Sequence, residues 1–281
     1  MKTMVSVIIP FYHGSGYVPQ LLQMMRNNAA VLRASTDTDL EVLLVNDSPE
    51  ETIAVQEEML FNLKIITNPK NLGIHASRVH GLEEARGEYI LFLDQDDRIT
   101  DNCLVSQLRA IGDADLVIGN GYDCEAGGGK HLIFQDAAHQ KAAGRLSCHY
   151  YYNNLIRSPG QVLIRKASIP LYWTERILKN NGSDDAFLWI LMLCRRCTAV
   201  INEDIVYEHV FTGENASGND TAMLRSQMEV AGLLKGIASP MGLTAFQRRA
   251  RYYCTNGRNH KLCFLDVGFS RMMYSKLLIR D

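Results

Sequence analysis

The first 94 residues alternate short apolar runs with segments of helical spacing, and this alternation is the strongest constraint on the fold. The apolar runs cover residues 4–12, 40–47, 63–68 and 88–94. The helical segments cover residues 16–35, 48–60 and 73–87. Ser48 as N-cap and Pro49 at the first helical position give the middle segment a clear start signal. Because the runs are apolar almost throughout, as in strands buried on both faces, the order predicts an α/β fold with a parallel sheet covered by helices.

Three acids end the fourth apolar run. Asp94, Asp96 and Asp97 follow Tyr89–Leu93 directly, and carboxylates this close repel one another unless a positive charge lies among them. Ligands of such sheets bind beyond the carboxyl ends of the strands, where Asp47 also stands. The Asp-x-Asp spacing suits Mg²⁺ or Mn²⁺, which takes one or two protein carboxylates and fills its shell with diphosphate oxygens and water. For Asp97 alone, a helix cap is the alternative.

The turn after the first run tests a dinucleotide-binding interpretation. Gly14 and Gly16 supply two glycines of that fingerprint, but Pro19 stands where the third is required. Hydride-transfer chemistry is therefore disfavoured.

A second acidic pair, Asp184–Asp185, opens a later apolar segment of helical spacing. Residues 180–183 predict a turn before it, and a helix N-terminus favours negative charge. The pair is thus explained either by helix electrostatics alone or by a catalytic carboxylate. A carboxylate that acts as a base must lie within hydrogen-bond reach of the hydroxyl whose proton it takes.

Composition and cysteine usage indicate an ordinary soluble protein. The chain has 281 residues, of which 47% are hydrophobic and 21% charged. Its seven cysteines form no framework pattern, which points to reduced thiols in a cytosolic setting. The first apolar run is broken by Pro10 and is expected to be a strand rather than a leader. We therefore expect a cytoplasmic protein that makes no nucleic-acid contact.

The C-terminal part of the chain differs in charge. Residues 241–281 hold eight Lys or Arg against two Asp. Helices are predicted over 221–237, 243–255 and 261–281. Such a basic helical extension, over 219–281, would face anionic partners, including the inner face of a membrane; a helical lid with solvated charges is the alternative.

Four segments together resemble the inverting family 2 glycosyltransferases, which have the GT-A fold and use nucleotide-sugar donors. They read VSVIIPFYHGSGYVPQLL, EVLLVNDSPEE, NLGIHASRVHGLEEARGEYILFLDQDD and NGSDDAFLWILML. The resemblance implies a Rossmann-like, mostly parallel central sheet flanked by helices. It further implies a catalytic domain over 1–218, with a nucleotide-binding half (1–120) and an acceptor-side half (121–218), before the helical extension.

The resemblance assigns donor-binding roles to residues near the strand ends. Pro10 and Tyr12 match the first-strand turn that flanks the nucleotide base. Asp47 matches an acid that hydrogen-bonds the base or ribose, and Arg78 matches an arginine near the nucleotide. An arginine there would pair with phosphate in a planar fork, although a solvated helix residue is the alternative for Arg78.

The resemblance also assigns a metal site. Asp94 and Asp96 match the family's Asp-x-Asp motif, with Asp96 as the direct ligand of Mn²⁺ or Mg²⁺, and Gln95 between them is expected at the donor. The family often supplies a histidine to the metal where this chain has Thr212. Either His209 reaches the metal instead, or the third ligand is absent.

The second acidic pair matches the family's Glu-Asp motif, whose aspartate is the general base. Asp185 is then the predicted base and Asp184 its acidic neighbour. Since Asp replaces the usual Glu, the resemblance leaves open which of the two acts.

These observations predict a metal-dependent inverting glycosyltransferase. It would move a sugar from a nucleotide diphosphate, by family frequency UDP, to a saccharide or lipid-linked saccharide, as in bacterial surface-polysaccharide synthesis. The alternatives are a nucleotidyltransferase, which would be expected to carry a basic phosphate loop after the first strand, and a sugar-nucleotide-binding protein without turnover.

Overall fold

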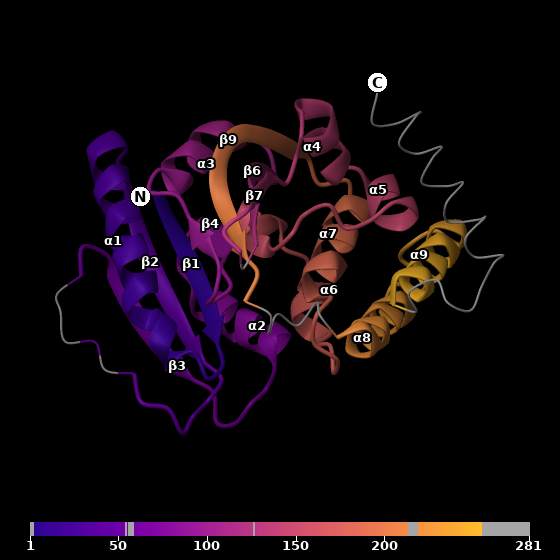
Figure 1. Cartoon of the computed structure of the whole chain (residues 1–281), viewed down its shortest axis with the longest axis horizontal. Coiled ribbons are helices and arrows are strands. Elements are labelled where there is room, and N and C mark those ends of the chain that lie inside the picture. Colours follow the sequence, from indigo (N-terminus) through magenta and orange to yellow (C-terminus); the bar gives the residue numbers. More distant parts are fainter. Residues whose placement is uncertain (1–2, 54, 56–58, 126, 213–218, 255–281) are drawn as a thin grey trace. The chain divides into compact units, whose positions relative to one another are not determined.

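The computed structural model describes the chain except for residues 1–2, 54, 56–58, 126, 213–218 and 255–281 (Figure 1). Contacts divide the chain into two compact units. The first comprises residues 1–133, 157–169 and 199–212, and the second comprises 134–156, 170–198 and 213–281. This grouping differs from the expected division at residue 218. That residues 1–218 and 219–281 form separate domains stays a prediction.

The first unit is built on one mixed sheet. In the described residues the strand order is β3-β2-β1-β4-β8-β6-β9-β5, with β7 paired to β6. The strands are β1 Thr3–Phe11, β2 Thr38–Asn46, β3 Asn62–Thr67, β4 Tyr89–Phe92, β5 Arg98–Ile99, β6 Leu116–Cys124, β7 Lys130–Leu132, β8 Val162–Arg165 and β9 Ala199–Val210. The first four strands in this order run parallel, as do β6 and β9, while β8 is antiparallel to both of its neighbours. The four strands predicted from the apolar runs are confirmed as β1 to β4.

The register of the parallel strands aligns their carboxyl ends. Phe11 of β1 pairs with Asn46 of β2, and Ile8 pairs with Phe92 of β4. The chain segments that leave these strands, beginning at Tyr12, Asp47 and Leu93, therefore emerge at one edge of the sheet. Strands β1, β2 and β4 are buried along most of their length, as expected for parallel strands covered on both faces, whereas β3 is largely exposed.

Helices flank the sheet, which confirms the predicted α/β class. The α-helices of this unit are α1 Val18–Ser35, α2 Ile74–Glu84 and α3 Cys103–Ile111, and its 3₁₀ turns are Ser15–Tyr17, Pro159–Gln161 and Lys166–Ser168. Helix α1 contacts β2 and α3, whereas α2 contacts β1 and β2. Gly81 allows the close approach of α2, because a Cβ there would lie 2.4 Å from Cγ2 of Ile8.

The helix predicted over 48–60 is wrong for the part of it that the structure describes. Residues 48–53 form turns and irregular backbone. The side chain of Asn46 competes for the groups that a helix would use: its Nδ2 donates to the Glu51 carbonyl over 2.9 Å, and its Oδ1 accepts from the Ser48 N–H over 2.8 Å. Ser48 and Pro49, which have the sequence of a helix start, therefore lie in a turn that the Asn46 side chain closes.

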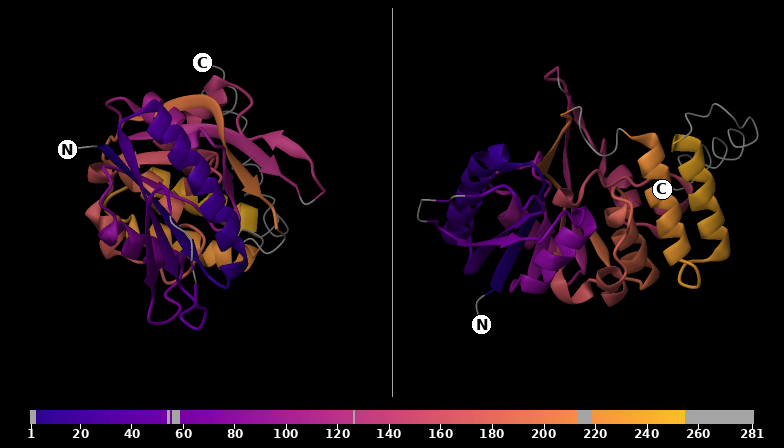
Figure 2. Two further views of the ribbon diagram at one scale, coloured as in Figure 1. Left: turned by 90° about the vertical axis from the view of Figure 1, so that its left-hand side faces the viewer. Right: turned by 90° about the horizontal axis from the view of Figure 1, so that it is seen from below.

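The second unit is helical in its described residues. It contains α4 Ala137–Ala143, α5 Leu146–Tyr151, α6 Leu171–Glu175, α7 Asp184–Cys194, α8 Asp220–Leu233 and α9 Pro240–Cys254. Helix α7 is buried from Ala186 to Met192, so it is apolar all round rather than on one face. Helices α5 and α6 pack against it, and α9 packs against α5 and α8. Figure 2 shows α8 and α9, in orange and yellow, lying side by side.

Helices α8 and α9 confirm two of the three helices predicted in the C-terminal extension; the third, over 261–281, lies outside the described residues. Hydrogen bonds join α8 to the rest of its unit: the Glu229 carboxylate accepts from the N–H groups of Lys179 and Asn180, at 2.8 and 3.0 Å, and the Tyr172 hydroxyl donates to Leu233. In the described part of the chain, no helix combines the length and apolarity that a membrane crossing needs.

His149 on α5 is a buried titratable group of the second unit. Its Nε2–H donates to the carbonyl of Ala143 over 2.9 Å, and its side chain is almost fully enclosed. Burial lowers the pKa of His149 to about 4; the bond to Ala143 opposes this, and the charge of Arg249 adds to it. The folded protein therefore holds His149 neutral at a pH where an unfolded chain would protonate it.

This burial predicts a specific acid sensitivity. Because the folded pKa lies below the unfolded value, the stability associated with neutral His149 is complete above about pH 6.5 and is lost as the pH falls toward 4, by about 3 kcal/mol in all. Denaturant unfolding between these pH values should show a shallower pH dependence in His149→Gln than in the wild type. The exposed His131 gives the control variant His131→Gln, and equal pH slopes in all three proteins would contradict the account.

Candidate active site

The edge formed by the ends of β1, β2 and β4 gathers most of the residues that the resemblance assigned to the donor. Tyr12 leaves β1 with a largely exposed side chain, and its ring lies 4.1 Å from that of His13. Pro10 is buried within β1 and pairs with Val45. The acids Asp94 and Asp96 follow β4.

Asp94 is held by two partners. Arg78, which is 3% exposed on α2, donates from Nη2 to Oδ1 of Asp94, and the Ser158 hydroxyl donates to Oδ2 over 3.0 Å. Burial raises the pKa of Asp94, repulsion from Asp97 adds to this, and the Arg78 guanidinium opposes it. Arg78 is thus a buried ion-pair partner, so the alternative of a solvated helix residue is wrong.

Asp97 joins the acidic loop to β9. Its buried carboxylate accepts from the Tyr207 hydroxyl, from the Val210 N–H over 3.1 Å and from His209 Nδ1, also over 3.1 Å. The alternative reading of Asp97 as a helix cap is wrong, because the following helix, α3, has Asn102 at its N-cap position. Asp97 instead satisfies polar groups of β9 inside the unit.

This arrangement disfavours the charged form of Asp96. Burial and repulsion from Asp97 and Asp94 raise its pKa to about 6. A group whose charged form is opposed in this way would be stabilised by a cation beside it. The carboxylates of Asp94 and Asp96 are hard oxygen donors of the kind that Mg²⁺ and Mn²⁺ prefer, so the donor set fits such an ion.

The third proposed ligand, His209, is held by the same network. Its Nδ1 faces Asp97, and this hydrogen bond raises the pKa of His209. When a neutral histidine donates from Nδ1 to a carboxylate, the lone pair on its Nε2 is available to a metal ion, as in metal-bound histidines. Among the residues that the structure describes, no group of three His, Cys, Asp or Glu side chains is arranged to hold a metal ion. Metal ligation by His209 stays a prediction.

Asp47 holds the loop between β3 and α2. Its buried carboxylate accepts from Asn68 Nδ2 and the Leu72 N–H through Oδ1, and from the Gly73 N–H through Oδ2, each over 2.8 Å. Gly73 has φ +88° as the N-cap of α2, a conformation that favours glycine. Asp47 therefore positions the start of the helix that carries Arg78, and its contact with a base or ribose stays a prediction.

Gln95 joins the acidic loop to the first-strand turn. Its Oε1 accepts from the Tyr12 N–H over 3.0 Å, and its Nε2 donates to the Tyr12 carbonyl over 3.3 Å. Gly14 makes room for it, since a Cβ there would lie 2.2 Å from Gln95 Oε1. These bonds give Gln95 a bridging role in the described structure, and its contact with a donor stays a prediction.

Sequence reasoning missed Ser158 and Tyr207 at this edge. Ser158 lies 64 residues beyond Asp94, and Tyr207 lies 110 residues beyond Asp97. Neither stands in a motif that signals its partner, because both are brought to the acids by strands β8 and β9. To predict these two residues, one would have to know that β8 pairs between β4 and β6.

The second acidic pair lies in the other unit, at the start of α7. Asp184 is buried, and its backbone carbonyl accepts from Trp173 Nε1 over 2.9 Å. Asp185 is partly exposed, and its Oδ2 accepts from Asn154 Nδ2 over 3.0 Å. Both acids stand in the first turn of the helix, as predicted.

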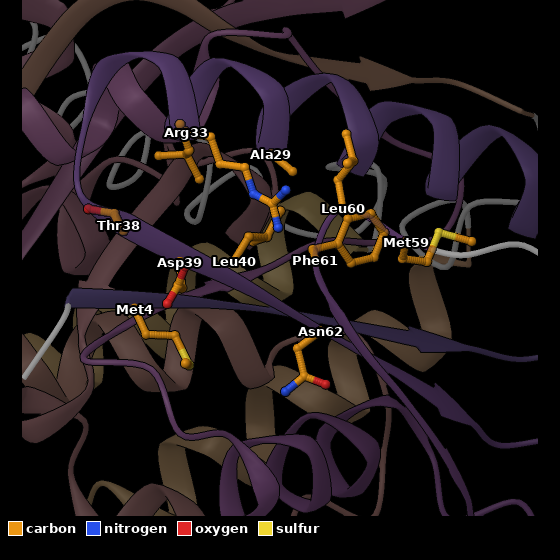
Figure 3. A pocket seen from close by; sticks show the side chains of 11 residues that line it. Met4, Ala29, Arg33, Thr38, Asp39, Leu40, Met59, Leu60, Phe61 and Asn62 are labelled. Atoms are coloured by element: carbon orange, nitrogen blue, oxygen red, sulfur yellow. The ribbon is translucent and has the colours of Figure 1, made fainter.

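A cavity of about 320 Å³ in the first unit lies at the opposite edge of the sheet (Figure 3). It is lined by residues from the start of β1, β2 and β3 and from the end of α1. Met4, Leu40 and Phe61 form apolar walls, and Arg33 and Asp39 are its charged residues. None of the predicted site residues lines it, so we place the candidate active site at the acidic edge and not in this cavity.

The sheet and the helices that flank it define an α/β protein of the GT-A type, with an acidic edge at the carboxyl ends of its parallel strands. The model of glycosyl transferase family 2 matches residues 6–169, more than half of the chain. The chain therefore belongs to glycosyl transferase family 2.

Known proteins similar to this chain include an uncharacterized glycosyltransferase of Haemophilus influenzae. It is 34% identical over 94 residues, which are 34% of this chain and 30% of the relative. The match thus spans less than a third of that relative's own length.

Two solved structures share the fold. TarS residues 1–349 from S. aureus, in complex with UDP-GlcNAc, aligns over 99% of this chain and 76% of that chain, with a TM-score of 0.61 and 17% identity. Mannosyltransferase PcManGT from Pyrobaculum calidifontis, in complex with GDP-Man and Mn²⁺, aligns over the same shares with a TM-score of 0.59 and 12% identity. At these identities the likeness shows the fold alone.

The network around Asp97 predicts a stability effect. Asp97→Ala would remove the acceptor of the buried Tyr207 hydroxyl and of the part-buried Val210 N–H, so the free energy of unfolding should fall by roughly 2–4 kcal/mol. Denaturant titration measures this, with Asp113→Ala, at an exposed acid, as the control. An Asp97→Ala protein as stable as the wild type would contradict the structural role of Asp97.

Proposed function

We propose that this chain is a metal-dependent inverting glycosyltransferase. It would transfer a sugar from a nucleoside-diphosphate donor, with UDP-sugars as the first candidates, to a hydroxyl of a saccharide or lipid-linked saccharide. The observation that carries the proposal is the acidic edge: Asp94 and Asp96 at the carboxyl end of β4, with Arg78 buried behind them. Family membership supports the transferase class. The two fold neighbours, solved in complex with UDP-GlcNAc and with GDP-Man and Mn²⁺, support the donor class and the metal.

Separate residues of this chain would have separate roles in the transfer. Asp94 and Asp96 would hold Mn²⁺ or Mg²⁺, which when bound stabilises negative charge on the departing diphosphate. Arg78 fixes Asp94 through their ion pair, and Tyr12, whose side chain is exposed at the end of β1, would flank a base. Asp47 keeps α2, and with it Arg78, at the edge.

Asp185 would act as the general base. It would take the proton of the acceptor hydroxyl as that oxygen attacks the anomeric carbon from the face opposite the diphosphate. One C–O bond forms while the bond from the anomeric carbon to the diphosphate oxygen breaks, so the anomeric configuration inverts. The diphosphate leaves with the electron pair of the broken bond.

The proposed acceptor and cellular location rest on the family and not on any residue of this chain. We propose an acceptor on the path to bacterial surface polysaccharide, and a cytoplasmic protein with contact to the inner membrane face through the basic C-terminal part. Arg249, one of the basic residues counted there, is buried and hydrogen-bonds Asn153, so it does not contribute to a membrane-facing surface in the described structure.

The metal assignment predicts a loss of cation binding at one side chain. Asp96→Ala should weaken Mn²⁺ binding in the presence of UDP at least tenfold, because it removes the carboxylate expected to ligate the ion directly. Electron paramagnetic resonance of Mn²⁺ measures free and bound ion, and Asp113→Ala is the control. Unchanged Mn²⁺ affinity in Asp96→Ala would exclude Asp96 as a ligand.

The base assignment predicts a separation of binding from transfer. Asp185→Asn should lower kcat by at least a hundredfold and leave the affinity for UDP with Mn²⁺ unchanged, since the amide cannot take the proton. Asp184→Asn, at the buried neighbour, is the comparison. If Asp184→Asn abolishes transfer while Asp185→Asn retains it, the roles are reversed; if no wild-type transfer occurs although UDP binds, the chain is a binding protein without turnover.

A further inference from the structure

Asn154 is oriented by contacts on both sides of its amide. Nδ2 donates to Asp185 Oδ2 over 3.0 Å, while Oδ1 accepts from the Ile156 N–H over 3.2 Å. Because Oδ1 faces a backbone donor, the amide cannot be rotated by half a turn without placing N–H against N–H. The donor of Asn154 is therefore directed at Asp185 by the local backbone.

The neighbouring residue, Asn153, connects this amide to the C-terminal helix. Asn153 Oδ1 accepts from the Asn154 N–H over 2.9 Å and from Arg249 Nη1 over 2.7 Å. On the other side, Cys148 Sγ donates to the Asn153 carbonyl over 3.4 Å. The segment before Asn154 is thus fixed from α5 and from α9.

Arg249 is an unusual residue to find inside this unit. It is 4% exposed on α9, and its guanidinium lies 5.0 Å from the ring centroid of Phe246. A buried arginine costs free energy unless its charge and donors are used. Its bond to Asn153 uses one donor to hold the backbone that presents Asn154 to Asp185.

We propose that Asn154 is a positioning residue for Asp185, and that Arg249 of α9 holds Asn154 in place through Asn153. The inference rests on the proposed function, in which Asp185 takes the acceptor proton. A general base acts only from hydrogen-bond reach of that proton, and a displacement of about 1 Å can lower the rate about a hundredfold. The neutral amide of Asn154 holds one oxygen of the Asp185 carboxylate without adding a positive charge of its own. Helix α9 therefore contributes to the transfer step.

The substitutions Asn154→Asp and Asn154→Ala together separate positioning from packing. Aspartate has the shape of asparagine and retains the oxygen that accepts from the Ile156 N–H, but it replaces the donor to Asp185 with a second acceptor. The repulsion between two carboxylates at this distance would itself displace Asp185. A loss in Asn154→Asp therefore counts for positioning only where Asn154→Ala, which removes the donor without adding a charge, shows the same loss.

The experiment uses the full chain and compares five proteins besides the wild type: Asn154→Asp, Asn154→Ala, Arg249→Met, Arg249→Lys and the control Arg248→Met, which alters the exposed neighbour on the same helix. Kinetics with a UDP-sugar donor and Mn²⁺ give kcat and the donor KM. We expect kcat to fall about 10- to 100-fold in both Asn154 variants and in Arg249→Met, with the donor KM unchanged. Arg249→Lys should recover part of the loss, and Arg248→Met should match the wild type.

A crystal structure of each variant supplies a readout that does not depend on turnover. In the wild type, Asp185 should hold one rotamer with Oδ2 on Asn154, and in Asn154→Ala and Arg249→Met it should leave that position. An Asp185 that keeps its rotamer in both variants overturns the positioning inference, whatever the rates. If Asp185 moves and kcat does not change, the base role of Asp185 in the proposed function is wrong, while the positioning contact itself stands. An unfolded Arg249→Met protein leaves the decision to Asn154→Ala.

Discussion

The ion pair between Arg78 and Asp94 is the interaction on which the acidic edge depends. Three acids follow one buried strand, and the first of them could not remain there as a carboxylate without the guanidinium of α2 and the hydroxyl of Ser158. Asp47 holds the loop that starts α2, so one carboxylate positions the partner of another. The Asp97 carboxylate accepts hydrogen bonds from Tyr207 and Val210 of β9. Burial and the neighbouring acids raise the pKa of Asp96 to about 6, and a cation beside this side chain would stabilise its charged form.

The local patterns of the sequence predicted the sheet and its edge. Continuous apolar runs gave β1 to β4, and the rule that ligands bind at the carboxyl ends of parallel strands placed Asp47 and Asp94 together. The helix over 48–60 was predicted wrongly, because capping preferences at Ser48 and Pro49 cannot reveal that the Asn46 amide uses the same backbone groups. Ser158 and Tyr207 were missed for a different reason: their contacts depend on strand pairings between distant segments, and no short pattern encodes the insertion of β8 between β4 and β6.

Charge patterning was an incomplete guide to the C-terminal part of the chain. Arg249 counts as a surface charge in the sequence, yet it lies buried against Phe246 and donates to Asn153. Glu229 of α8 accepts from the backbone before α7. Helices α8 and α9 thus support the segments that carry Asn154 and Asp185 within the second unit. The sequence-based division at residue 218 separates this extension from Asp185, whereas hydrogen bonds connect α8 and α9 to the segments that carry Asn154 and Asp185.

The central claim is that the acidic edge binds a nucleoside diphosphate together with a divalent cation. Calorimetric titration of the full wild-type chain with UDP, GDP, CDP and TDP, each with and without Mn²⁺, tests it most directly. The account predicts that UDP binds in the presence of Mn²⁺ and that its affinity falls at least tenfold without the ion. Equal affinity with and without Mn²⁺, or no binding of any of the four nucleotides, would contradict it.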